Sequence, residues 1–244
     1  MTDWDETHAE WWLGEVASDP AYASEVLPLA LEMLLPEAGK TYLDLGCGEG
    51  RMLAAIGAAG ARAIGVDASP RLAAVASTIA PVVIGTLPGL EFLRDASVDG
   101  VIVVLVLEHL EDHSRLLTEA GRVSRPGGVL TLVVNHPLIT APDSAPVIDD
   151  DGEVLWRWGR YFADGYTEET AGGLTVRFHH RTISDLLGVA AAVGWVLEAI
   201  AEAGAGPERA AIDPIIAAQV ELPRLLALRW RKSTTPVAVV PHPG

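Results

Sequence analysis

The sequence contains one cysteine, Cys47, in a chain of 244 residues. A single thiol cannot form a disulfide bond within the chain, and it cannot supply a zinc site built from several cysteines. The histidines do not show the spacing of a metal site either, so we expect no bound metal. The scarcity of cysteine favours a reducing compartment, and we expect a cytoplasmic protein.

Basic residues are also scarce, because 17 lysines and arginines face 33 acidic residues and leave a net charge of −16. A surface of this sign repels phosphates, so we expect no nucleic-acid partner. The chain lacks a run of about 18 apolar residues, and its start, MTDWDE, has neither the basic nor the apolar region of an export signal. We therefore expect no membrane partner.

One stretch of the sequence is more informative than these absences. Residues 42–52 read YLDLGCGEGRM, which is an apolar strand pattern with an acidic residue, followed by a glycine loop and the start of a helix. Gly46 and Gly48 allow a positive φ and a close approach of the backbone to a ligand, and the N–H groups of the next helix provide a positive end. This pattern predicts a nucleotide-cofactor site.

The spacing disfavours a dinucleotide. The dinucleotide loop needs the pattern G-x-G-x-x-G, and Arg51 stands at its third glycine. Asp44 would repel a pyrophosphate but suits an ammonium group. The expected ligand therefore carries an amino acid end and a ribose.

This stretch resembles motif I of the class I S-adenosylmethionine-dependent methyltransferases. Three further stretches are similar to later elements of that family, in the same order: residues 63–70 (AIGVDASP), 98–109 (VDGVIVVLVLEH) and 125–128 (RPGG). The resemblance covers about residues 40–135 well and the rest of the chain loosely.

Short apolar strands alternate with helical stretches between residues 41 and 135. We expect strands near residues 41–45, 62–66, 82–85, 98–105 and 129–135. Such alternation is typical of a doubly wound parallel sheet, whose ligands bind at the carboxyl ends of the strands. After a helix at 184–193, residues 195–201 and 224–231 are similar to the antiparallel pair that ends the family's sheet. The expected fold is therefore α/β, Rossmann-like, with a mostly parallel seven-stranded sheet and helices on both faces.

We expect a single domain over residues 1–232 with two additions. Residues 1–40 form a helical extension across the cofactor mouth, and residues 136–182, with scattered prolines, form an insertion that caps the site. Residues 233–244 are expected to be a disordered tail.

The resemblance implies S-adenosylmethionine as the cofactor and S-adenosylhomocysteine as the product. It implies that Asp67 holds the ribose hydroxyls and that Asp44 pairs with the amino group, directly or through water. For Asp44, a capping role within the loop is the alternative. The expected cofactor contacts are Asp44, Gly46, Cys47, Gly48, Asp67, Ala68, Thr86, Leu87, Leu105 and His109.

One position departs from the family. Where many members have an acidic residue that binds the adenine amino group, this chain has Gly85. We expect the adenine to be held by backbone groups near Thr86 and Leu87, by the Thr86 hydroxyl and by an apolar wall.

Four histidines are candidate bases: His109, His136, His179 and His180. With an ordinary pKa of about 6.5, a histidine can take a proton from an attacking hydroxyl. For His109 the alternative is a cap of the helix that begins near Asp112. For His179 and His180 it is that one is solvated and the other pairs with the acidic insertion.

The expected substrate contacts are Trp12, Trp156, Arg160, Tyr161 and Arg181. The aromatic rings would wall an organic molecule, and either arginine would hold a substrate carboxylate by a two-pronged bond. The protein is expected to act as a monomer or homodimer.

The sequence thus predicts methyl transfer from S-adenosylmethionine to a heteroatom of a small organic molecule. Oxygen is preferred over nitrogen, because a hydroxyl gains more from a neighbouring imidazole. The alternatives are a pericyclase or lyase that binds the same cofactor, a non-catalytic binding protein of the same fold, and a nicotinamide-dependent dehydrogenase.

Overall fold

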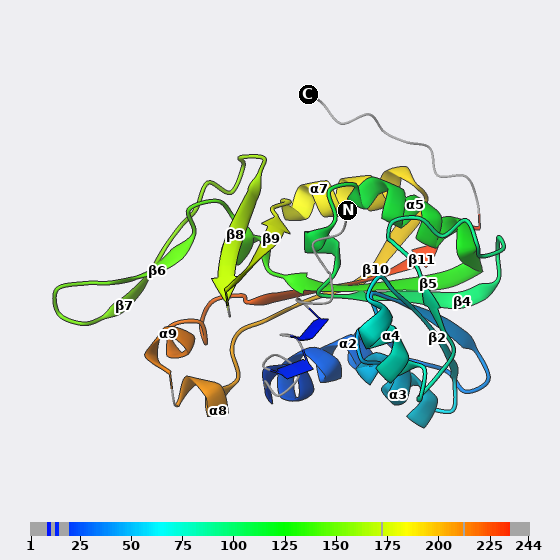
Figure 1. Ribbon diagram of the computed structural model, residues 1–244. Coiled ribbons are helices and arrows are strands. Elements are labelled where there is room, and N and C mark those ends of the chain that lie inside the picture. Colours follow the sequence, from blue (N-terminus) through cyan, green and yellow to red (C-terminus); the bar gives the residue numbers. More distant parts are fainter. Residues whose placement is uncertain (1–8, 11–12, 15–19, 172, 212, 235–244) are drawn as a thin grey trace.

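The computed structural model describes residues 9–10, 13–14, 20–171, 173–211 and 213–234 (Figure 1). A seven-stranded sheet forms the centre of this part of the chain, with the order β10-β11-β5-β4-β1-β2-β3. Its strands are β1 (Thr41–Leu45), β2 (Arg62–Asp67), β3 (Val82–Ile84), β4 (Val98–Val104), β5 (Ser124–Asn135), β10 (Trp195–Ala203) and β11 (Leu225–Lys232). All neighbours pair in parallel except β11, which is antiparallel to β5 and β10. The predicted doubly wound sheet is confirmed.

Helices cover both faces of the sheet. In Figure 1, α5 (His113–Val123) and α7 (Ile183–Ala192) lie above it, and α2 (Leu27–Leu34), α3 (Arg51–Ala58) and α4 (Pro70–Ala76) lie below it. The alternation of side chains along each strand supplies both interfaces, as β1 illustrates. Tyr42 packs with the buried residues of α2 and α3, while Leu43 and Leu45 pack with those of α5 and α7. Residues on both sides of β1 are fully buried, which explains the continuous apolar run.

Several helices begin where the sequence offers a capping side chain. The Ser69 hydroxyl accepts the Leu72 N–H at the start of α4, and Pro70 occupies the first helical position. The Asp112 carboxylate accepts the Arg115 N–H at the start of α5, so this residue, not His109, caps that helix. These caps fix where each helix starts, and so set the length of the loops at the carboxyl ends of the strands.

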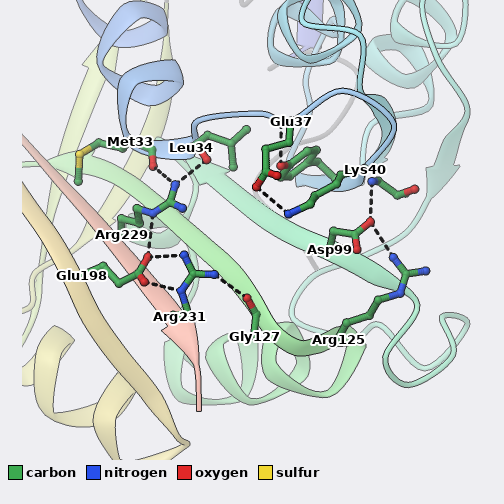
Figure 2. Close-up of polar contacts among 12 residues, drawn as sticks. Met33, Leu34, Glu37, Lys40, Asp99, Arg125, Gly127, Glu198, Arg229 and Arg231 are labelled. Carbon is green, nitrogen blue, oxygen red and sulfur yellow. Dashed lines mark hydrogen bonds and ion pairs between the residues drawn. The ribbon is translucent and has the colours of Figure 1, made fainter. Parts of the chain in front are cut away.

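The N-terminal segment contains the π-helix η2 (Tyr22–Val26) and α2, and it is held against the sheet by Arg229 of β11. The Arg229 Nη1–H donates to the Met33 and Leu34 carbonyls at the end of α2, at 2.7 and 2.6 Å. Figure 2 shows this contact beside the ion pairs that Glu198 makes with Arg229 and Arg231. A cation at the C-terminus of a helix satisfies its unpaired carbonyls, so Arg229 fixes α2 in place.

A second anchor lies at the other end of this segment. The Glu25 carboxylate of η2 accepts the Gly206 N–H at 2.9 Å, and it pairs with Arg209 and Arg224. Residues about 180 positions apart in sequence are thereby joined. The two anchors set the position of Tyr22, which lies in η2.

The segment 136–182 contains the short helix α6 (Pro137–Thr140) and two hairpins, β6–β7 (Ala145–Ile148, Val154–Arg157) and β8–β9 (Tyr166–Ala171, Leu174–His179). The β6–β7 hairpin extends away from the sheet at the left of Figure 1. The short helices η3 (Leu107–His109), α8 (Pro207–Ala210) and α9 (Pro214–Ala217) complete the description. Of this segment, β9 supplies the residues that line the cavity described below.

Some expectations concern residues outside the described part of the chain. Trp12 lies there, as do residues 235–244 of the expected disordered tail. Among the described residues, no helix is long and apolar enough to cross a membrane. The same residues contain no group of three or more histidine, cysteine, aspartate or glutamate side chains that would hold a metal ion.

Candidate functional site

A cavity of about 420 Å³ opens at the carboxyl ends of β1, β2 and β4. Its walls come from the loops that follow these strands, from the loop after β3, from η3 and from β9, with Tyr22 added by η2. The lining residues are Tyr22, Gly46, Cys47, Gly48, Glu49, Arg51, Asp67, Ala68, Leu72, Thr86, Leu87, Pro88, Val104, Leu105, Val106, His109, Leu110, Glu111, Asp112, Val176, Arg177 and His179. The cavity thus lies at the edge where the parallel sheet was expected to bind its ligand.

The glycine loop after β1 is bound to the end of β2. The Gly46 and Cys47 N–H groups both donate to the Val66 carbonyl, at 2.8 and 3.1 Å. Gly46 has a φ of +76°, and a Cβ at this position would overlap the Val106 side chain. A side chain is therefore excluded here both by backbone conformation and by space.

Asp67 ends β2 at the floor of the cavity. One of its carboxylate oxygens accepts the Gly48 N–H at 2.8 Å, and the other accepts the Ser69 N–H at 2.9 Å. Burial raises the pKa of this carboxyl, and the two backbone donors oppose that rise. Each carboxylate oxygen has about two acceptor positions, so each keeps one for a hydroxyl group of a ligand.

Asp44 lies beneath the loop and does not line the cavity. It is 2% exposed, and burial, followed by the nearby Asp67 and Glu49 carboxylates, raises its pKa from 3.8 to about 8. Without a ligand, the protonated form of Asp44 is therefore favoured near neutral pH. An ammonium group bound at the loop would reverse this preference, because an opposite charge lowers the pKa of a carboxyl.

Tyr22, Glu49 and Arg51 also line the cavity, and none of them is among the expected cofactor contacts. The Arg51 guanidinium lies 5.0 Å from the centre of the Tyr22 ring and pairs with Glu49 at 2.6 Å. Burial, followed by the nearby Asp44 and Glu49 carboxylates, raises the pKa of Tyr22. Its hydroxyl therefore stays protonated and is a hydrogen-bond donor close to two carboxyl groups.

Cys47 contributes its backbone and a packing contact. Its side chain is buried against Gly65 of β2, where an added Cβ would come within 2.6 Å of the Cys47 sulfur. Burial, followed by the Asp44 charge, raises the pKa of the thiol. A thiol with a raised pKa is a poor nucleophile, so the arrangement gives Cys47 no chemical role.

Ala68, Leu72, Thr86, Leu87 and Pro88 form the wall beyond Asp67. The Gly85 N–H donates to the Asp67 carbonyl at 2.9 Å, which places the loop after β3 next to the end of β2. This wall is mainly apolar, and the Thr86 hydroxyl is the one side-chain hydroxyl among these five residues.

On the opposite side, the loop after β4 meets β9. Leu105 has a φ of +54°, a left-handed conformation that costs about 1–3 kcal/mol for a leucine. The His109 Nδ1–H donates to the Arg177 carbonyl at 2.9 Å, and its ring lies 4.9 Å from that of Phe178. His109 therefore holds β9 beside the cavity.

His179 also lines this side of the cavity. Burial, followed by the Arg181 charge, lowers its pKa. A lowered pKa keeps the imidazole neutral near pH 7, and a neutral imidazole has one nitrogen that accepts a proton.

Comparison with known proteins agrees with this geometry. A protein-family model described as "Methyltransferase domain" matches residues 43–132. A crystal structure of an S-adenosylmethionine dependent methyltransferase from Mesorhizobium loti superposes with a TM-score of 0.74, at 27% identity over 84% of this chain and 96% of that chain. Residues 43–132 thus match a methyltransferase domain, and the fold is that of the class I S-adenosylmethionine-dependent methyltransferases.

Among curated relatives, an uncharacterized methyltransferase of Mycobacterium tuberculosis is 34% identical over 142 residues, which are 57% of this chain and 56% of the relative. A ubiquinone biosynthesis O-methyltransferase of Xanthomonas oryzae is 28% identical over 132 residues, 50% of this chain and 54% of the relative. The chain thus spans little more than half the length of the curated relatives that it matches.

The cavity fits S-adenosylmethionine on two observations. Gly46, which packs against Val106 with no room for a side chain, lines the cavity with its backbone, and Asp67 keeps acceptor positions for two hydroxyl groups. The tenth expected cofactor contact, Asp44, lies beneath the glycine loop. The structure brings the other nine to the cavity: Gly46, Cys47, Gly48, Asp67, Ala68, Thr86, Leu87, Leu105 and His109.

Two of the four candidate histidines lie away from the cavity. His136 is 2% exposed, its Nδ1 accepts the Leu138 N–H at 3.1 Å, and its Nε2–H donates to Glu202 at 2.8 Å. The His180 Nε2–H donates to the Tyr161 carbonyl at 2.8 Å, and its Nδ1 contacts the Thr140 hydroxyl at 3.2 Å. Both imidazoles have two structural partners, so neither reaches a substrate in this arrangement.

The four expected substrate contacts within the described residues also point elsewhere. The Arg181 guanidinium donates to the Leu107, Leu110 and Glu111 carbonyls, and Arg160 pairs with Asp143 at 2.7 Å on the surface. The Trp156 Nε1–H donates to the Ser144 hydroxyl, and the Tyr161 hydroxyl accepts the Ile183 N–H. None of these four side chains lines the cavity. The expectation of a carboxylate clamp is therefore not met by this geometry.

Proposed function

We propose that the protein transfers the methyl group of S-adenosylmethionine to a hydroxyl oxygen of a small organic molecule. The observation that carries this proposal is the position of His179, which lines the same cavity as the glycine loop and Asp67. A base is thereby placed in the compartment that binds the methyl donor.

The choice of oxygen follows from the state of His179. Its pKa is lowered, so the imidazole is neutral at pH 7 and can accept the proton that a hydroxyl loses as it attacks. A neutral amine attacks with its free lone pair and needs a base less. The Xanthomonas relative, whose name describes an O-methyltransferase, is consistent with an oxygen acceptor.

When bound, the cofactor supplies a methyl group on a sulfonium, which is already a good leaving group. The protein therefore mainly aligns the acceptor, excludes water and removes a proton. Asp67, Asp44 and the glycine loop would hold the cofactor, and Tyr22 would cover its amino acid end. His109 holds β9 so that His179 faces the acceptor.

The charges around the cavity favour a neutral or cationic acceptor. Glu111 and Asp112 lie in its wall, and the basic residue beside them, Arg177, is paired with Glu168 at 3.0 Å. The Arg177 guanidinium also lies 4.1 Å from the centre of the Tyr166 ring. An acceptor carboxylate would therefore meet acidic side chains and a guanidinium that already has partners, while the net charge of −16 argues against a nucleic acid.

The proposal is tested with methyl-labelled S-adenosylmethionine and matched aromatic acceptors that differ only in bearing a hydroxyl or an amine. Each pair is also offered with and without an added carboxylate. We expect label on the hydroxyl compounds without a carboxylate, and we expect His179→Asn to lower the rate by about 100-fold or more while S-adenosylhomocysteine still binds. Label found only on amines, or full activity of His179→Asn, would contradict the proposal. Binding of S-adenosylhomocysteine without any transfer would favour the pericyclase, lyase or binding-protein alternatives.

A further inference from the structure

His179 lies between the cofactor cavity and a second, much smaller cavity. The second cavity has a volume of about 20 Å³ and, like the first, is lined by His179. Its other polar lining residues are Glu108, Asn135, Thr140 and Arg181. A space of at least about 10–15 Å³ with several polar partners accommodates one water molecule.

Glu108 supplies a buried carboxylate to this small cavity. The residue is 4% exposed, and its Oε1 accepts the Asn135 backbone N–H at 3.3 Å and the Asn135 side-chain N–H at 3.0 Å. Its Oε2 is buried and has no hydrogen-bond partner among the described residues. A buried carboxylate oxygen without a donor is costly, so this atom requires a donor such as water.

The neighbouring arginine does not provide that donor. The N–H groups of Arg181 that make hydrogen bonds donate to the carbonyls of Leu107, Leu110 and Glu111. Its positive charge, like that of Arg177, opposes a second positive charge on His179, whereas the Glu111 carboxylate favours it. His109 on η3 also opposes a positive charge on His179, and the Tyr166 ring lies 6.0 Å from the His179 ring. Glu108 lines the small cavity together with His179, and its buried carboxylate would offset the two arginines.

The inference rests on the proposed function, because it assigns His179 as the base. We propose that Glu108 is a positioning residue that acts on His179 through one water molecule in the small cavity. The water donates to Glu108 Oε2 and accepts the N–H of one ring nitrogen of His179, so that the other ring nitrogen faces the acceptor.

The charge balance of the reaction explains why such a residue is useful. As the acceptor oxygen takes the methyl group, its O–H bond breaks and the proton moves to His179. The electron pair of the broken sulfur–methyl bond stays on sulfur. The positive charge of the sulfonium is therefore replaced by that of the imidazolium, and the Glu108 carboxylate stabilises this imidazolium through the water.

The test measures the pKa of His179 by NMR in protein saturated with S-adenosylhomocysteine. His179→Asn assigns the resonance. Glu108→Gln keeps the side-chain carbonyl that accepts the Asn135 N–H groups but removes the negative charge, and Glu153→Gln, at an exposed position beside β7, is the matched control. We expect Glu108→Gln to lower the His179 pKa by about 0.5 unit or more and Glu153→Gln to leave it unchanged. An unchanged pKa in a folded Glu108→Gln protein would overturn the inference.

A second measurement needs no variant at Glu108. Long-range ¹⁵N–¹H spectra of the wild-type complex report the tautomer of each histidine, and we expect a single fixed tautomer for His179. Rapid averaging between the two tautomers would overturn the inference even if Glu108→Gln fails to fold. The proposed function is tested separately, because its failure would appear as no binding of S-adenosylhomocysteine or no transfer by the wild-type protein.

Discussion

The Asp67 carboxylate accepts a 2.8 Å hydrogen bond from the Gly48 N–H. This bond joins the end of β2 to the glycine loop after β1, so one residue both holds the loop and faces the cavity. The loop and the expected ribose contact are therefore a single unit, and a change in either is expected to disturb both.

Gly46 is the position where the loop tolerates substitution least. Its φ is +76° and a Cβ would overlap Val106, whereas a Cβ at Gly57 of α3 meets nothing within 4 Å. We expect Gly46→Ala to destabilise the protein by about 1–3 kcal/mol and to weaken binding of S-adenosylhomocysteine. Gly57→Ala should stabilise it by up to about 1 kcal/mol, because alanine favours a helix. Urea unfolding and calorimetry measure both effects, and wild-type affinity of Gly46→Ala would contradict the close approach.

Asp44 predicts a pH dependence of cofactor binding. Its pKa in the ligand-free protein is raised from 3.8 to about 8, so below pH 8 a proton must leave before it can pair with an ammonium group. Affinity for S-adenosylhomocysteine should rise by about tenfold per pH unit between about pH 6 and 7.5, and Asp44→Asn should flatten this slope. A flat profile in the wild-type protein would rule out ionised Asp44 as the partner.

The same raised pKa predicts the opposite trend for the stability of the ligand-free protein. A folded-state pKa above the unfolded value gives a contribution that is complete below about pH 4 and is lost as the pH rises towards about 8. Asp44→Asn should remove this part of the pH dependence in urea unfolding.

Tyr22 is expected to act through its ring. The ring lies on the Arg51 guanidinium at 5.0 Å and covers one end of the cavity. Tyr22→Ala should weaken binding of S-adenosylhomocysteine by about tenfold, since it removes a cation–π contact and an apolar cover. Tyr22→Phe keeps the ring and should stay within about threefold of wild type. Equal losses in the two variants would assign the role to the hydroxyl instead.

Arg229 and Arg125, both shown in Figure 2, differ in what they hold. Arg229 bonds two carbonyls at the end of α2, while Arg125 makes a partly exposed ion pair with Asp99 at 2.7 Å. We expect Arg229→Ala to lower the free energy of unfolding by about 1–3 kcal/mol and Arg125→Ala by less than about 1 kcal/mol. Equal effects in urea unfolding would mean that α2 does not depend on Arg229.

The sheet was predictable because local rules determine it. Parallel strands that are buried on both faces need apolar runs such as that of β4. The positive φ and the lack of space beside Val106 require a glycine at position 46. The largest difference among the strand boundaries is at β5, which begins at Ser124 rather than 129, because pairing with β4 starts at Val98 and continues across an irregularity after the turn.

Much of the catalytic side of the site was not predictable, because it depends on contacts between distant segments. His136 makes a hydrogen bond to Glu202, which lies 66 residues later in the sequence. Arg181 makes hydrogen bonds to carbonyls about 70 residues earlier. Tyr22 and Arg177 line the cavity from elements without a motif, so no local pattern marks them. Arg51 stands where the dinucleotide pattern requires a glycine, and this departure is the one sequence signal that its side chain belongs to the site.

Calorimetric titration with S-adenosylhomocysteine tests the central claim most directly, with wild type compared with Asp67→Ala and with Asp164→Asn, an exposed aspartate outside the cavity. We expect the wild type and Asp164→Asn to bind equally and Asp67→Ala to bind about 100-fold more weakly or not at all. NAD should bind to none of the three. Unchanged affinity in Asp67→Ala, or binding of NAD in place of S-adenosylhomocysteine, would contradict the assignment of this cavity.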